Sequence, residues 1–242
     1  MNKLKCLTNN QLKIIACISM FIDHFAVMCF PNILILRVIG RIAFPIFAFM
    51  IAEGCYYTRN KLKHLLTIFI LGVIMQIVLY YAMNMTDFSI FLVFTVSIIL
   101  IYIFEYIDGK IKDKNILMTI IASIVLLSLI CVLIWFTNNY NYFVMNYNFF
   151  GIITPLLIYI LKKYTNKSYI LLSAIIIIIG SIIHAIHLKF YTNIYAIFGV
   201  ALLFLYNGKR GKTNLKYFFY LFYPLHFVFI YAIQLLILGK LF

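Results

Sequence analysis

The sequence predicts an all-α, polytopic membrane protein with about nine transmembrane helices. Of its 242 residues, 66% are hydrophobic and only 11% are charged, and the mean hydropathy is +1.07. A soluble domain carries roughly 25% charged residues, so this chain cannot cover its surface in water. Long apolar runs also alternate with short basic segments, which is typical of helices that cross a bilayer.

The apolar runs set the number of predicted spans. A helix needs about 20 apolar residues to cross a hydrocarbon layer of about 30 Å. The nine predicted spans are 12–30, 33–57, 62–83, 88–107, 116–136, 148–161, 169–189, 192–206 and 215–238. The sixth and eighth are short, so we expect them to be tilted, partial or re-entrant. The spans form a single domain, 1–242, and no separate soluble domain is expected.

The basic residues predict the orientation of these spans. Sixteen of the 20 Lys and Arg residues lie before or at the start of span one, or follow spans two, four, six and eight. Cytoplasmic loops collect Lys and Arg, so we predict an N-terminus inside and a C-terminus outside. The same rule explains the net charge of +14 without a nucleic-acid partner. The basic start resembles a signal peptide but lacks a small-x-small cleavage site, so we expect a retained first span.

Span one is interrupted by FIDHF, which contains Asp23 and His24, and span two contains Arg37 and Arg41. A charge inside a bilayer costs between about 2.5 and 17 kcal/mol, so such residues persist where they meet partners, water or substrate. By helix rise, Asp23, His24 and Arg41 all lie about 10–12 Å below the same membrane face. The loop between the two spans is short, so these four side chains are expected in one layer.

Asp23 and His24 are adjacent, so they point about 100° apart on a helix. We therefore expect Asp23 to anchor an Arg and His24 to face a cavity. A buried Asp–Arg clamp with a merely packed His is an alternative of equal weight. Glu53, about 18 Å from Arg41 along the helix, is expected to meet inner-face bases or a polar channel.

Other polar residues are weaker candidates. His184 and His187 share a helix face, but no carboxylate lies nearby, so a water-bonded pair is favoured over a metal site. His226 follows Pro224 in span nine, where a kink is often found beside a binding cavity, although a packed histidine is equally compatible. The segment YNGKRG (206–211) holds Lys209 and Arg210, which suit a phosphate group, although any inner loop needs positive charge.

Two kinds of function use these parts. An acyltransferase could take a phosphate-bearing donor such as acetyl-CoA at the inner face, with His24 as general base and the Arg pair holding a carboxylate or an oxyanion. A proton-coupled transporter or channel for a small anion or exported precursor would use a similar relay of Asp, His and Arg. A non-catalytic assembly factor is a third possibility. The residues alone do not separate these functions.

Two long motifs resemble the TraX family. They are IDH (22–24) with LRVIGRIAFPIFAFMIAEGCYYTRN (36–60), and YNGKRG (206–211) with KYFFYLFYPLH (216–226). They cover about a quarter of the chain, at both of its ends. The resemblance implies a transmembrane acyltransferase of the plasma membrane, since TraX acetylates the N-terminal amine of a conjugative pilin.

The resemblance also implies roles for the residues that match these motifs. His24 is the expected catalytic base, with Asp23, Arg37 and Arg41 beside it. The donor acetyl-CoA is expected at Glu53, Arg59, Lys209, Arg210, Tyr223 and His226, and no metal is expected. Pro45 and Pro224 are expected to set helix shape only. The partners would be acetyl-CoA, an exported or cell-surface acceptor (a peptide amine, glycan or lipid) and membrane lipids, without nucleic acid.

Overall fold

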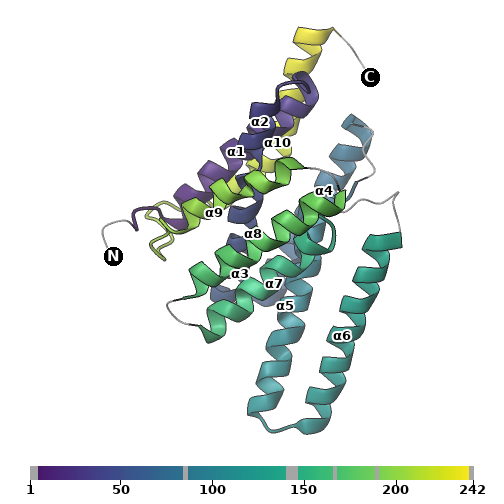
Figure 1. The fold of residues 1–242 in the computed structure, drawn as a ribbon, viewed down its shortest axis with the longest axis vertical. Helices are drawn as coiled ribbons and strands as arrows, with labels where there is room; N and C mark the ends of the chain where they lie inside the picture. The colour runs from purple at the N-terminus through teal and green to yellow at the C-terminus, as the bar shows by residue number, and fades with distance from the viewer. Residues whose placement is uncertain (1–4, 84–86, 140–146, 166–167, 189–190, 240–242) are drawn as a thin grey trace. The chain divides into compact units, whose positions relative to one another are not determined.

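The computed structural model describes residues 5–83, 87–139, 147–165, 168–188 and 191–239. Helices make up the ordered elements of these ranges (Figure 1). In chain order they are α1 (Asn9–Cys29), α2 (Leu34–Gly40), α3 (Ala43–Tyr57), α4 (Lys61–Met83), α5 (Ile90–Lys112), α6 (Ile116–Asn139), α7 (Asn148–Tyr164), α8 (Tyr169–Leu188), the 3₁₀ helix η1 (Tyr191–Ala196), α9 (Ile197–Leu203) and α10 (Lys216–Leu238).

Within the described ranges, seven segments are long and apolar enough to cross a membrane. They are Asn9–Cys29, Leu34–Tyr57, Lys61–Tyr81, Ile90–Lys112, Ile116–Asn139, Tyr169–His187 and Lys216–Ile237. The predicted all-α fold is therefore confirmed for the described residues, with seven candidate membrane spans. The count of nine spans stays a prediction, because α7 has 17 residues and Tyr191–Leu203 is also shorter than the spanning helices. These two segments correspond to the short sixth and eighth predicted spans. The orientation also stays a prediction, because helix length and composition do not determine it.

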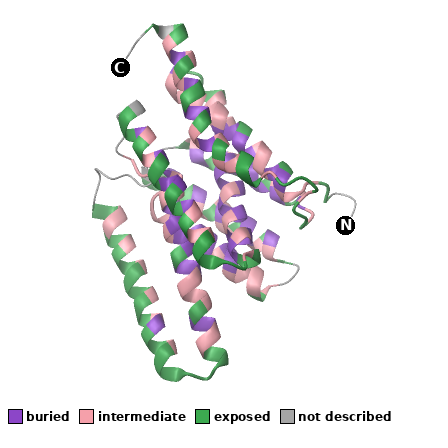
Figure 2. Ribbon diagram, turned by 180° about the vertical axis from the view of Figure 1, so that it is seen from behind, coloured by how far each residue is buried: buried purple, intermediate pink, exposed green. Residues whose placement is uncertain are grey.

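The chain divides into two compact units, which are described separately. The first contains Met1–Met50, Tyr81–Met83 and Leu161–Phe242, and the second contains Ile51–Tyr80 and Asn84–Ile160. In the first unit, α1 packs against both α2 and α10, and α8 packs against η1 and α9 (Figure 1). In the second, α5 and α6 pack together, and α6 shows an exposed surface along most of its length (Figure 2).

The start of α1 is held by its cap and by a distant loop. Thr8 and Gln11 form a capping box, which satisfies amide groups that a helix start leaves open. The amides of Asn9 and Asn10 donate to the carbonyls of Lys209 and Arg210, at 2.8 and 3.1 Å. The first unit therefore joins the N-terminal end of α1 to the loop that precedes α10.

The predicted second span is not one continuous helix. It breaks at Arg41 and Ile42, between α2 and α3, where the Ile42 amide bonds to Ile39 in a tight turn. Pro45 lies in the first turn of α3, where a missing N–H costs no helical hydrogen bond. Gly199 of α9 approaches the backbone of Ile42 so closely that a side chain at 199 would overlap it. The break lets α9 pack against the chain beside Arg41.

Candidate functional site

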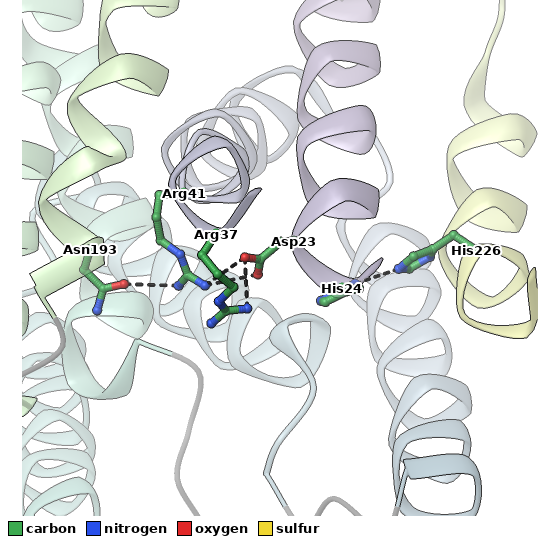
Figure 3. A network of polar contacts seen from close by, with 6 residues as sticks. All are labelled: Asp23, His24, Arg37, Arg41, Asn193 and His226. Atoms are coloured by element: carbon green, nitrogen blue, oxygen red, sulfur yellow. Dashed lines mark hydrogen bonds and ion pairs between the residues drawn. The ribbon is translucent and has the colours of Figure 1, made fainter. Parts of the chain in front are cut away.

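A part-buried ion cluster joins α1 to α2 in the first unit. Arg37 Nη1 lies 3.0 Å from Asp23 Oδ1, and Arg41 Nη2 lies 3.1 Å from both oxygens of the same carboxylate (Figure 3). The three side chains are 10–19% exposed. Two guanidinium groups thus converge on one carboxylate, which leaves this cluster of three with a net positive charge.

Gly40 explains how Asp23 comes so close to α2. A Cβ atom at position 40 would overlap the Cβ, Cγ and Oδ1 atoms of Asp23. The absence of a side chain at this position lets the carboxylate lie against the backbone of α2, between the two arginines. The four-residue spacing of Arg37 and Arg41 then places both guanidinium groups on the same side.

The cluster continues into the segment formed by α8 and η1. Arg41 Nη1 donates to Asn193 Oδ1 at 3.1 Å, and Asn193 Nδ2 lies 2.8 Å from His184 Nδ1. Asn193 is 3% exposed and His184 is 7% exposed. A hydrogen-bonded chain therefore runs from Asp23 through Arg41 and Asn193 to His184. Asn193 is absent from the predicted site, because a single Asn in a short helical segment carries no motif.

His24 belongs to a different contact, on α10. Its Nδ1 atom lies 2.8 Å from Nε2 of His226, and the two rings stack with centroids 5.1 Å apart. Figure 3 shows Asp23 and His24 pointing away from each other, one toward α2 and the other toward α10. The expected divergence of the two side chains is therefore visible in the structure, but His24 meets a second imidazole where an open cavity was expected.

Aromatic rings enclose the imidazole pair. Phe227 lies 4.4 Å from the His24 ring and 4.3 Å from the His226 ring, measured between centroids. Phe222 stacks on His226 at 5.4 Å, and Tyr223 meets it edge-on at 5.3 Å. His226 is 3% exposed. The pair is thus shielded by apolar surface, which strengthens any electrostatic interaction within it.

An apolar groove opens beside this pair. It has a volume of about 260 Å³ and is lined by Phe21 of α1 and, on α10, by Phe218, Leu221, Phe222, Leu225, His226 and Phe229. His226 is the one ionisable side chain in this lining. A substrate group in the groove would lie against apolar side chains and a single imidazole.

The remaining residues that are expected to contact acetyl-CoA fall into two sets. Lys209 and Arg210 are exposed in the first unit, and Tyr223 is buried against His226. Glu53, 2% exposed, and Arg59, which is exposed, belong to the second unit. The structure brings Tyr223 and His226 together in the first unit, and it brings His226 to His24.

The glycines near Lys209 and Arg210 have a structural explanation. Gly208 and Gly211 adopt φ angles of 75° and 101°, which favour glycine. A Cβ atom at position 211 would press against the side chains of Asn10 and Thr8. The Lys209 amide donates to Asn207 Oδ1 at 2.9 Å. This backbone therefore serves contacts within the protein, whereas the side chains of Lys209 and Arg210 are exposed.

His184 and His187 lie three residues apart on α8, a spacing that metal-binding histidines can have. Within the ranges that the structure describes, no group of three or more His, Cys, Asp and Glu side chains is arranged to hold a metal ion. His184 instead bonds to Asn193. The expected water-bonded pair is therefore not what the structure shows at His184, whose partner is the buried amide of Asn193.

Part of this chain is similar to proteins of two bacteria. A 72-residue segment is 43% identical to an uncharacterized protein of Rickettsia prowazekii, covering 29% of this chain and 27% of that protein. A 70-residue segment is 37% identical to a probable fimbrial assembly protein, FimC of serogroup H1, of Dichelobacter nodosus, covering 27% of this chain and 29% of that protein. These matches span less than a third of either relative.

No solved structure matches this chain. The family model for the TraX protein, in contrast, matches residues 8–234, which include α1, the imidazole pair, the ion cluster and nearly all of α10. The motifs that resemble this family lie near the two ends of the chain, whereas the family model also matches the residues between them. The chain therefore belongs to the TraX family.

Proposed function

We propose that this protein is an acetyltransferase of the plasma membrane. It moves an acetyl group from cytoplasmic acetyl-CoA to an acceptor at the outer face, with His24 as the general base. The observation that carries the proposal is the pair formed by His24 and His226, two imidazoles that lie 2.8 Å apart inside apolar helices. Histidine is the side chain best suited to take and return a proton near neutral pH.

The chain's own residues account for the proton. His24 takes it from the attacking amine or hydroxyl of the acceptor as the new bond to the acetyl carbon forms. The thioester bond breaks in the same reaction, and the proton passes to the departing thiolate, so no further reactant is needed. Acetyl-CoA supplies the activated acetyl group when bound. The exposed side chains of Lys209 and Arg210 fit its phosphates, since Lys and Arg form charge-assisted bonds with phosphate oxygens.

The ion cluster would stabilise negative charge near the reaction. Arg37 and Arg41 share one carboxylate, and their surplus positive charge favours an oxyanion or an acceptor carboxylate. Because Asp23 holds both arginines in fixed positions, this stabilisation needs little rearrangement during the reaction. Asp23 therefore acts on the arginines and not on His24.

The acceptor is proposed to be an exported peptide amine, with glycans and lipids as further classes. The name of the Dichelobacter relative, a probable fimbrial assembly protein, supports a surface polypeptide. Mass spectrometry of surface peptides, glycans and lipids from cells with and without this protein would identify it. An acetyl group that disappears with the protein supports the proposal, and an unchanged acetylation pattern in all three classes contradicts it.

A proton-coupled transporter is the second candidate. The chain of contacts from Asp23 through Arg41 and Asn193 to His184 favours it, because polar chains of this kind carry protons in pumps. Calorimetry with the purified protein separates the candidates. Binding of acetyl-CoA supports the transferase, whereas uptake of a small anion into proteoliposomes without acetyl-CoA binding supports the transporter. An assembly factor would show neither.

A further inference from the structure

The hydrogen bonds around His226 determine which nitrogen of His24 carries a proton. The backbone carbonyl of Phe222 lies 3.2 Å from His226 Nδ1, and a carbonyl oxygen can only accept. His226 Nδ1 must therefore carry a hydrogen. In the neutral ring this leaves His226 Nε2 without a hydrogen, as an acceptor.

The acceptor on His226 then sets the state of His24. His226 Nε2 lies 2.8 Å from His24 Nδ1, so His24 must donate from Nδ1. A neutral His24 consequently has no hydrogen on Nε2, and that nitrogen presents a lone pair. This is the form of the ring that a general base requires.

We propose that His226 is a positioning residue that holds the His24 proton on Nδ1 and keeps Nε2 ready to accept a proton. This role replaces the contact with acetyl-CoA that the motif predicts for His226. Its catalytic meaning rests on the proposed acetyltransferase, but the position of the proton is a property of the resting protein.

The imidazole pair can also hold the proton that His24 accepts during the reaction. When His24 Nε2 accepts a proton, its Nδ1 proton can pass to His226 Nε2 across 2.8 Å. His226 then carries hydrogens on both nitrogens and a positive charge, with Nδ1 still donating to Phe222. Reversal of this transfer returns the proton through His24. The hydrogen bond to Phe222 thus supports both states of the pair.

Local packing explains why the carbonyl and the imidazole meet. Phe222 and His226 are four residues apart on α10, and their rings stack. Phe227 contacts both imidazoles and limits their rotation. The arrangement therefore needs only α10 and the facing side of α1, which are packed together in the first unit.

Nitrogen NMR of the full-length protein in nanodiscs tests the proposal directly. The five histidines are labelled with ¹⁵N, and the His24 signals are identified by their loss in His24→Asn. At mildly alkaline pH, where both rings are neutral, we expect the His24 proton on Nδ1. A wild-type protein with this proton on Nε2 overturns the proposal, whether or not it transfers acetyl groups.

Two variants supply a functional readout. His226→Phe removes the acceptor and keeps a ring for the aromatic packing, so the His24 proton should leave Nδ1 and kcat should fall about 10²-fold with little change in KM. His226→Gln keeps an acceptor near the same place and should restore part of kcat and the Nδ1 proton. A His226→Phe protein with the native melting temperature and unchanged kcat overturns the positioning role. Failure of the wild type to transfer acetyl groups would instead contradict the proposed function and leave the NMR result intact.

Discussion

Asp23 and His24 are neighbours in the chain, yet they bind partners on different helices. Asp23 binds Arg37 and Arg41 of the α2 segment, whereas His24 binds His226 on α10. Consecutive residues point about 100° apart on a helix, so two adjacent polar residues in α1 can make contacts with two different helices. The carboxylate stabilises the arrangement of α1 and α2, and the imidazole remains available for chemistry.

Replacement of Asp23 should mainly affect stability. Asp23→Asn removes the one negative charge shared by Arg37 and Arg41, and breaking a buried pair costs about 3–5 kcal/mol. We expect a lower melting temperature in nanodiscs and reduced membrane yield. Asp113→Asn is the control, because its carboxylate is 64% exposed and pairs only with Lys110 nearby. Equal melting temperatures for the two variants would contradict the role of Asp23.

Gly40 should tolerate no side chain. Gly40→Ala puts a methyl group into the space of the Asp23 carboxylate, and overpacking of this kind costs about 1–3 kcal/mol. Gly109→Ala is matched to it, since nothing lies within 4 Å of that position in α5. Alanine there should leave stability unchanged or raise it by up to about 1 kcal/mol through helix propensity. If Gly40→Ala had the higher melting temperature of the two variants, the close contact between Gly40 and Asp23 would be contradicted.

Asn193 should support Arg41. Asn193→Leu leaves Arg41 and His184 without the amide between them, and an unmade buried hydrogen bond costs about 1–3 kcal/mol. We expect a lower melting temperature and weaker acetyl transfer. Asn139→Leu is the control, because Asn139 is exposed and its amide donates to its own helix. Wild-type stability and transfer in Asn193→Leu would remove Asn193 from the site.

The transfer rate should have an acidic limb. The general base must be neutral to take a proton, so activity should fall as the imidazole pair becomes protonated. Tyr223 meets His226 edge-on, whereas Asp23 and its two arginines lie on the other side of α1, away from the pair. Initial rates in proteoliposomes from about pH 8 down to the acid limit of the folded protein measure this limb. A rate that stays constant down to that limit would argue against a histidine base.

The local parts of the site could be predicted from the sequence. Depth and the short loop after α1 predicted that Asp23 meets an arginine, because two consecutive helices are neighbours when their connection is short. The direction of His24 away from Asp23 followed from helix geometry alone. These inferences needed only 1.5 Å of rise and 100° of turn per residue.

The distant parts could not be predicted in this way. His24 and His226 are 202 residues apart, and no local rule specifies which helix packs against α1. Asn193 lies in a 3₁₀ segment without a motif, and its partner Arg41 is 152 residues away. The break at Arg41 and Ile42 lies against Gly199 of α9, which is also a tertiary contact. The reaction class itself came from the family resemblance.

The most direct test of the central claim is acetyl transfer by His24→Ala and His187→Ala. Each variant is reconstituted in proteoliposomes with radiolabelled acetyl-CoA and the acceptor identified by mass spectrometry. His187 is a matched control, since it is a histidine on a spanning helix outside both contact networks. The account predicts that His24→Ala loses at least about 10²-fold in rate at unchanged membrane yield, while His187→Ala retains the wild-type rate. Wild-type transfer by His24→Ala would contradict it.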